Sequence, residues 1–466
     1  MAGAGADLGT DEIRGLLFRL ALPTIASQAV NMLYNLVDRV YIGHIPEIGT
    51  HALTGVGICL PVSILISAFA SLAGMGGAPR ASIEMGRGNR EAAERILGNC
   101  AGLLLLLSAV LTGAFLAFHR PILAAFGASG STISYAAEFL QIYVLGTVFV
   151  QITLGLNAFL IAQGFTAASM VTVLIGAGLN LLLDPIFIFA LDLGVRGAAL
   201  ANVLSQGASA LWVLRFLTGK QTLWRLRLRN LRLRPWIILP CLGLGLSPFF
   251  MTTTDSLIAV CFNSSLLRYG GDLAVGAMTV LTSVMQFAMM PLQGLTQGAQ
   301  PIVSHNFGAG SVARLREAIR LVVTSCVIYS MSLWLLVQLF PRVIIGIFTP
   351  DPALTEYTVP ALRLYMGCTG IFGIQVACQQ TLVALSDAGT SLFLAVLRKL
   401  VLLVPLIWLL PHCFRDPVFG VFLAEPVADG IAVAVTAALF AVQFRKMLRG
   451  MACEAGGKPG QHQSQF

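Results

Sequence analysis

A stripe of polar side chains lies inside the first long apolar stretch of this 466-residue chain. Gln28, Asn31, Asn35 and Asp38 follow one another at spacings of three and four residues, so a helix brings all four to one face. Tyr34 stands one turn before Asp38. Because the stripe ends in a carboxylate, it predicts a face that binds and releases a cation or a proton. A structural seam of hydrogen bonds between two helices is the alternative.

A second polar group stands in the fifth apolar stretch. Asn180 and Asp184 are four residues apart and share a helical face, and Pro185 follows directly. Proline has no N–H, so the carbonyl of Leu181 loses its helical partner. The resulting set of oxygens suits a hard monovalent cation such as Na⁺, or a proton. Asn202, in the next apolar stretch, is a candidate fourth oxygen. An Asp that caps a helix break is the alternative.

A third face is typical of a surface that accepts many compounds. Gln286, Met289, Gln293, Gln297 and Gln300 recur at helical spacing in the eighth apolar stretch. Methionine adapts its shape to different partners, and its mixture with Gln favours a wet cavity over the alternative of plain apolar core. The residues predicted to line the substrate cavity are Gln28, Asn31, Asn157, Asp255, Met285, Gln286, Met289 and Gln293.

The second half of the chain carries acids of its own. Asp255 lies in the polar run 252–256, and Glu425 and Asp429 lie one turn apart near the C-terminal end. These acids have either a coupling role or a structural one, in which they pair with cationic side chains. The candidate cationic partners are Arg363, Arg398 and Lys399.

All of these groups must be carried by membrane-spanning helices. Apolar residues make up 57% of the chain and charged residues 11%, and the mean hydropathy is +0.83. Soluble domains carry about 25% charged residues. A helix needs about 20 apolar residues to cross a bilayer core. Twelve stretches qualify, at 14–43, 51–79, 96–118, 133–162, 166–190, 197–218, 236–266, 273–304, 317–340, 357–386, 390–411 and 418–443. The predicted fold class is therefore an all-α polytopic membrane protein with twelve transmembrane helices.

The two halves of the chain repeat each other. Gly76, Pro79, Ser82, Gly86 and Gly88 recur as Gly298, Pro301, Ser304, Gly308 and Gly310, at a constant offset of 222. Six spans per half give both halves the same orientation, and paired halves indicate a transporter with its site between them. The predicted division is a lobe at 1–218, a basic linker at 219–235, a lobe at 236–447 and a tail at 448–466.

The polar site is not repeated. Asn263 takes the position of Asp38, and Val404-Pro405 stands where Asp184-Pro185 stood. We therefore expect a cation to reshape the first half, with Pro23 and Pro185 as hinges.

Lysine and arginine predict the orientation. They gather in the second-to-third loop, the sixth-to-seventh linker, the eighth-to-ninth loop and the tail, so both termini are expected in the cytoplasm. This pattern accounts for the net charge of +8, and no nucleic-acid partner is expected. The nine cysteines show no metal-binding spacing. The Walker A, GxSxG and HExxH motifs are missing, so we expect neither ATP drive nor an enzyme.

Several motifs, taken together, are specific to one family. They are Leu20-Ala21-Leu22-Pro23, Tyr34-Asn35-Leu36-Val37-Asp38 with Ile42-Gly43, Gly298-Ala299-Gln300-Pro301, Asn306-Phe307-Gly308-Ala309-Gly310, and Ala424-Glu425-Pro426 with Asp429. Over about residues 8–447 the chain resembles the MATE (multidrug and toxic compound extrusion) family, in the branch near DinF and MepA. The resemblance implies two six-helix lobes around a central cavity and export driven by Na⁺ or H⁺.

The same resemblance assigns residues. It implies that Asp38, Asn180 and Asp184 match the N-lobe cation site of that branch, with Asn202 where the family commonly has Thr. Asp255 resembles an acid in the seventh span of the NorM branch. The acid that NorM carries in the tenth span has no equivalent here, where Gln379 and Gln380 stand.

The sequence therefore predicts a cation-coupled antiporter that exports amphipathic, often cationic, drugs by alternating access. It is expected in the bacterial inner membrane, in contact with lipids, as a monomer and without a cofactor. Tyr34 and Asn35 are predicted to join Asp38, Asn180, Asp184 and Asn202 in the coupling site. A flippase for lipid-linked precursors and a membrane-embedded transferase are the alternatives; the acidic first lobe argues against the flippase, and the missing Asp-rich motif against the transferase.

Overall fold

The computed structural model describes residues 7–45, 49–126, 132–349 and 351–456, and every regular element in them is helical. The first half contains α1 (Ile13–Gly43), α2 (Gly49–Gly86), α3 (Arg90–Ala125), α4 (Ile133–Leu145), α5 (Thr147–Ala162), α6 (Thr166–Pro185), the π-helix η1 (Ile186–Ala190) and α7 (Gly194–Thr218). The linker holds the short η2 (Leu228–Asn230). The second half contains α8 (Pro235–Gly308), α9 (Val312–Leu339), α10 (Pro341–Gly346), α11 (Pro352–Tyr365), α12 (Thr369–Ala384), α13 (Ala388–Val396), the π-helix η3 (Leu397–Leu403), α14 (Val404–Leu409), η4 (Leu410–His412) and α15 (Pro417–Gly456).

Twelve membrane spans can be counted among the described residues. Nine helices are long and apolar enough to cross a membrane, and two bent pairs, α4 with α5 and α11 with α12, each make one more span. The 74 residues of α8 are broken at Gly271, where φ is +63° and ψ is −162°, a backbone conformation that suits glycine. Unbroken, α8 would be several times longer than the bilayer core. Its second arm is the twelfth span, and the predicted fold class is confirmed.

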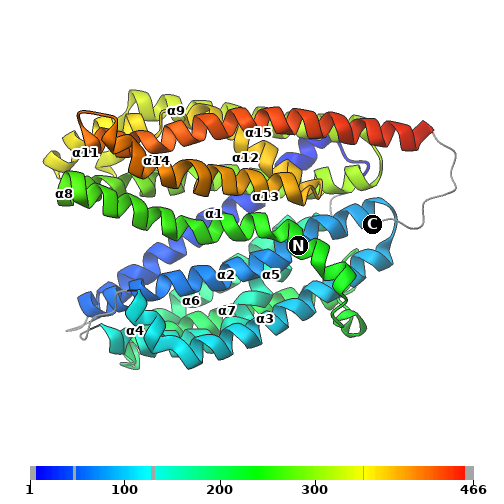
Figure 1. The fold of residues 1–466 in the computed structure, drawn as a ribbon. Coiled ribbons are helices and arrows are strands. Elements are labelled where there is room, and N and C mark those ends of the chain that lie inside the picture. The colour runs from blue at the N-terminus through cyan, green and yellow to red at the C-terminus, as the bar shows by residue number, and fades with distance from the viewer. Residues whose placement is uncertain (1–6, 46–48, 127–131, 350, 457–466) are drawn as a thin grey trace.

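The internal repeat is visible in the helices. Thr147–Ala162 (α5) and Thr369–Ala384 (α12) have the same length at an offset of 222, and each follows a bend, of 55° and 49° respectively. Helices α2 to α7 form one bundle and α9 to α15 the other, with both arms of α8 along their boundary (Figure 1). Helix α1 crosses between them: Leu16 and Leu20 join the apolar core of the second bundle, whereas Ile42 joins the first.

Glycines bring the two bundles into backbone contact. A Cβ at Gly86 would lie 2.1 Å from the carbonyl oxygen of His305, and one at Gly308 would lie 2.0 Å from that of Ile83. His305 is the repeat equivalent of Ile83, so the two contacts are related by the repeat. Only glycine allows α2 and the second arm of α8 to approach so closely. The bundles are therefore joined at the end that carries the Arg-rich loops.

The basic linker packs against the first bundle. Trp224 is fully buried against Phe159, with ring centroids 6.2 Å apart. Glu94 of α3 accepts an ion pair of 2.8 Å from Arg227, and Asn99 accepts the Arg234 N–H at 2.7 Å. The linker thus fastens the first arm of α8 to α3.

Candidate cation site and substrate cavity

The site in the first bundle begins at a change of helix type. Helix α6 runs regularly to Pro185 and continues as the π-helix η1. Proline lacks the N–H that a regular α-helix needs, and π-helical turns are frequent at functional sites. Asn180 and Asp184 lie one turn apart just before this change, and each is 1% exposed. The sequence predicted a disturbed helix at this proline; the structure shows no break there but a change to π-helical turns directly after it.

The two acids of the first bundle meet. Asp38 of α1 and Asp184 of α6 lie within side-chain hydrogen-bonding reach of each other. Asn180 Nδ2 donates to Asp184 Oδ1 at 3.3 Å. Two ionised carboxylates only accept hydrogen bonds and repel each other, so a proton or a metal cation between them would stabilise this arrangement. Residues 146 positions apart in the sequence are thus combined into one site.

Tyr34 and Asn202 close one side of this site. Asn202 Nδ2 donates to the Tyr34 hydroxyl at 2.8 Å, which joins α7 to α1. The Tyr34 ring lies close enough to Asp38 and Asp184 to interact electrostatically with both. Because Asn202 uses the hydroxyl as an acceptor, the hydroxyl proton is free to point at an acid.

Two oxygens in the site have no partner. Asn180 Oδ1 and Asp184 Oδ2 are buried and accept no hydrogen bond among the described residues. An unpartnered buried acceptor costs about 1–3 kcal/mol, so such atoms call for a ligand. Carboxylate and amide oxygens are the donor types that Na⁺ and a proton use, and the residues present fit either.

The rest of the α1 stripe points to other partners. Asn35 is exposed and its amide donates to the Asn31 carbonyl of its own helix at 2.7 Å. Gln28 Nε2 donates to Gln297 Oε1 of α8 at 3.2 Å. Pro23 lies inside a continuous α1, next to Thr24, whose hydroxyl donates to the Gly294 carbonyl at 2.5 Å. The N-terminal part of the stripe, at Gln28, therefore joins α1 to α8. Only the C-terminal end of the stripe, at Asp38, belongs to the acid pair.

The predicted cavity residues of α8 are partly accessible. Gln286 and Gln293 are exposed, and Met285 and Met289 are half-buried. Met289 packs against the apolar clusters on both sides of it. Asn157 instead donates from α5 to the Ser169 hydroxyl at 2.9 Å, inside the first bundle.

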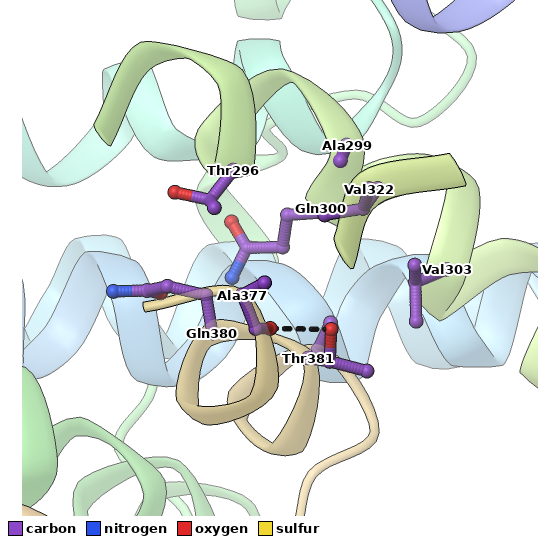
Figure 2. Close-up of a pocket in the computed structure, with 9 residues that line it drawn as sticks. Thr296, Ala299, Gln300, Val303, Val322, Ala377, Gln380 and Thr381 are labelled. Carbon is purple, nitrogen blue, oxygen red and sulfur yellow. Dashed lines mark hydrogen bonds between the residues drawn. The ribbon is translucent and has the colours of Figure 1, made fainter. Parts of the chain in front are cut away.

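Where α8 faces α12 in the second bundle, the described residues that line the space between them include two amides and no acid. Gln300 extends from α8 toward the turn of α12 that carries Ala377, Gln380 and Thr381 (Figure 2). The space between them is about 10 Å³, room for about one water. The Thr381 hydroxyl is already used, because it donates to the Ala377 carbonyl at 2.7 Å.

The acids of the second half are paired with cations. Lys399 donates to the Asp255 carboxylate and, at 2.5 Å, to the Met251 carbonyl. Arg398 donates to Asp429 at 2.7 Å and to Glu425 at 2.9 Å. Of the candidate partners, Arg398 and Lys399 form these pairs, and Arg363 forms no ion pair among the described residues. Lys399 and Arg398 lie in the π-helix η3, and π-helical turns recur at functional sites.

Comparisons with known proteins agree on one family. The family model described as MatE matches residues 23–186 and 249–409. The multidrug export protein MepA of Staphylococcus haemolyticus strain JCSC1435 is 23% identical over 425 residues, which cover 91% of this chain and 93% of that protein. MepA of Staphylococcus aureus strain MRSA252 is 24% identical over 427 residues, covering 90% and 92%.

Solved structures share the fold. A MATE protein crystallised in complex with MaD3S superimposes with a TM-score of 0.89 at 22% identity, over 96% of this chain and 99% of that one. A multidrug resistance MATE family transporter in an outward-facing conformation gives a TM-score of 0.87 at 22% identity, with the same coverage. Because the family model matches most of the chain in both halves, this chain belongs to the MATE family, as its motifs predicted.

Proposed function

We propose that this protein is a multidrug exporter that moves amphipathic, often cationic, compounds out of the cell in exchange for Na⁺ or H⁺. The MepA relatives are multidrug export proteins and align over about nine-tenths of both chains. The observation that carries the coupling is the contact of Asp38 with Asp184, beside the unpartnered Asn180 Oδ1. On this proposal the protein is a transporter and catalyses no covalent step.

The acid pair supports a binding step that depends on conformation. Asp38 belongs to α1 and Asp184 to α6, so a relative movement of these helices changes the distance between the carboxylates. A cation or proton that needs both acids binds the close arrangement better, and it shifts the equilibrium by that difference in affinity. The proton or Na⁺ enters as cargo of the exchange; the chain supplies the oxygens.

The glycine contacts support alternating access. They join the bundles at the end of the Arg-rich loops, which the charge pattern predicts to be cytoplasmic. The start of α1 and the end of α15 share one apolar cluster, so these two helix ends lie on the same side. We place the protein in the bacterial inner membrane, with this side facing the cytoplasm. Separation of the bundles here would expose the substrate site inward.

The flippase alternative is not favoured. The MepA relatives are multidrug exporters, and the candidate site of the first bundle is built around a pair of acids. In the second bundle the buried cations Arg398 and Lys399 are matched by three acids.

Exchange across a membrane tests the proposal. Purified protein in proteoliposomes is given a labelled cationic dye with Na⁺ and pH gradients imposed separately, for the natural chain and Asp38→Asn. The proposal expects dye movement that follows one gradient and is lost in Asp38→Asn. Gradient-driven movement that persists in this variant, at equal insertion, would contradict it. Removal of a charge inside the membrane should not harm insertion.

A further inference from the structure

A second cavity lies far from the acid pair, at the end where the bundles are joined. It has a volume of about 320 Å³, at the lower end of the range for small-molecule sites. Its walls come from the N-terminal segment, α2, the end of α5, the linker and the second arm of α8. The lining residues used below are Asp7, Ser82, Met85, Gln163, Trp224 and His305.

Polar atoms on this wall lack partners. The Ser82 hydroxyl, Gln163 Nε2, Trp224 Nε1 and His305 Nδ1 are buried and make no hydrogen bond among the described residues. Ser82, Gln163 and Trp224 are each at most 1% exposed. Four unpartnered groups on one cavity are many, because buried polar groups are nearly always paired.

The direction of the Gln163 amide is fixed. Its Oε1 accepts the N–H groups of Leu223 at 3.0 Å and Trp224 at 3.3 Å, so its NH₂ group remains as an unused donor. The indole N–H of Trp224 can only donate. The unused donors on residues that line this cavity therefore favour a ligand that carries acceptor oxygens.

The exposed part of the cavity carries the carboxylate of Asp7. Asp7 Oδ1 accepts the Gly9 N–H at 2.9 Å and the Thr10 N–H at 3.2 Å. Hydrogen bonds from the Thr10 side chain and from Gly9 lower the pKa of Asp7, which keeps it ionised. A ligand with a cationic group at this end would therefore be favoured over a neutral one. The side chains of Leu8 and Met85 suit an apolar body between the two ends.

The repeat provides an internal comparison. Ser304, the equivalent of Ser82, donates to the Ala384 carbonyl at 2.8 Å. Leu385 stands at the equivalent of Gln163 and belongs to the apolar core. The second half thus fills this place with packed, satisfied groups, whereas the first half leaves unpartnered donors on residues that line a cavity.

We infer that this cavity binds a small organic cation bearing acceptor oxygens, and that its occupancy holds the two bundles together at this end. Both bundles and the linker contribute to the wall, so such a ligand prefers the joined arrangement and shifts the equilibrium toward it. The proposal that the ligand holds the bundles together rests on the proposed alternating access. The proposal that the cavity binds a ligand does not depend on it.

Three soluble probes of related shape test the site. Acetylcholine has a fixed cation and an ester, choline lacks the ester, and 3,3-dimethylbutyl acetate is the neutral isostere. The full chain carries 5-fluorotryptophan at its five tryptophans, and Trp224→Phe identifies the ¹⁹F resonance of Trp224. Acetylcholine should shift that resonance saturably, and each of the other two probes should bind about tenfold more weakly, in line with the loss of about 1.4 kcal/mol.

Matched variants assign the contacts. Asp7→Asn keeps the acceptor for Gly9 and Thr10 but loses the charge, so it should weaken acetylcholine and leave the neutral isostere unchanged. Ser82→Ala should weaken acetylcholine several-fold, whereas Ser304→Ala should not. Acetylcholine binding should persist in Asp38→Asn, which separates this site from the proposed coupling site. No saturable shift with any probe, or equal affinities in the Asp7→Asn and natural chains, would overturn the site.

The holding role has its own measurement. Spin labels at Glu91→Cys and Arg316→Cys report the separation of the bundles near the glycine contacts, in a background without reactive cysteines. Acetylcholine should enrich the short distance, and Asp7→Asn should remove this effect. Binding without any change in the distances would refute the holding role while leaving the exporter proposal standing.

Discussion

Lys399 and Asp255 form an ion pair in which one partner is buried and the other exposed. The Lys399 side chain is 8% exposed and that of Asp255 is 66% exposed. The ammonium also donates to the Met251 carbonyl, one turn before Asp255 on the same helix. The chain thus supplies its own cation to the acid of α8, whereas Asp38 and Asp184 lie near each other and form no ion pair among the described residues. This difference favours the first bundle as the coupling site.

The two cations of η3 should differ in their effect on stability. Arg398→Met leaves Glu425 and Asp429 buried without a counter-charge and should cost about 3–5 kcal/mol. Lys399→Met should cost about 1 kcal/mol or less, because Asp255 stays in contact with solvent. Thermal unfolding of the detergent-solubilised variants measures both. A larger loss in Lys399→Met than in Arg398→Met would contradict the arrangement.

The glycine contacts should be sensitive to a single methyl group. Gly86→Ala and Gly308→Ala each place a Cβ about 2 Å from a carbonyl oxygen and should destabilise the joined arrangement by about 1–3 kcal/mol. Distances between spin labels at Glu91→Cys and Arg316→Cys should lengthen in both variants. Gly113→Ala is the control, since nothing lies within 4 Å of the added atom. If Gly86→Ala behaves like Gly113→Ala, the contact is misassigned.

Asp38 and Asp184 should act as a unit. Asp38→Asn and Asp184→Asn should each abolish ion-driven export, and the double variant should be no worse than either, because both remove the same shared ligand. Uptake of dye into proteoliposomes under each gradient measures this. Partial losses that multiply in the double variant would indicate two independent sites.

The exposed face of α8 should set substrate preference. Met289→Ala and Gln293→Ala should change which compounds are exported while the dependence on the ion gradient stays intact. A panel of structurally different cations, scored for export at equal expression, provides the measurement. An equal loss for all compounds would instead indicate damaged packing, since Met289 touches two apolar clusters.

Local patterns in the sequence were sufficient for the spans and for part of the site. Hydropathy gave twelve spans, and helical spacing placed Asn180 and Asp184 on one face, because both signals repeat within a few turns. The approach of Asp38 to Asp184 depends on how α1 packs against α6, and from the sequence it rested on a family resemblance. The choice of Arg398 over Arg363 as the partner of Glu425 also depends on three-dimensional packing.

Other features left little trace in the sequence. The cavity at Trp224 combines segments from five parts of the chain, and only Ser82 stood in a repeated motif. Gly86 and Gly308 were visible as a repeat, but their contact with the opposite bundle requires the relative position of the two halves. Long-range contacts of this kind follow from the fold and not from the spacing of residues in one helix.

The central claim is that the ion acts on the first half of the molecule alone. Paired spin labels within spans 1–6, and separately within spans 7–12, measure this directly in the absence of drug. A change of pH or Na⁺ should alter distances within spans 1–6, leave those within spans 7–12 nearly constant, and have no effect in Asp38→Asn. Equal changes within spans 7–12 would contradict the claim and would make Asp255 or Glu425 the better candidate for coupling.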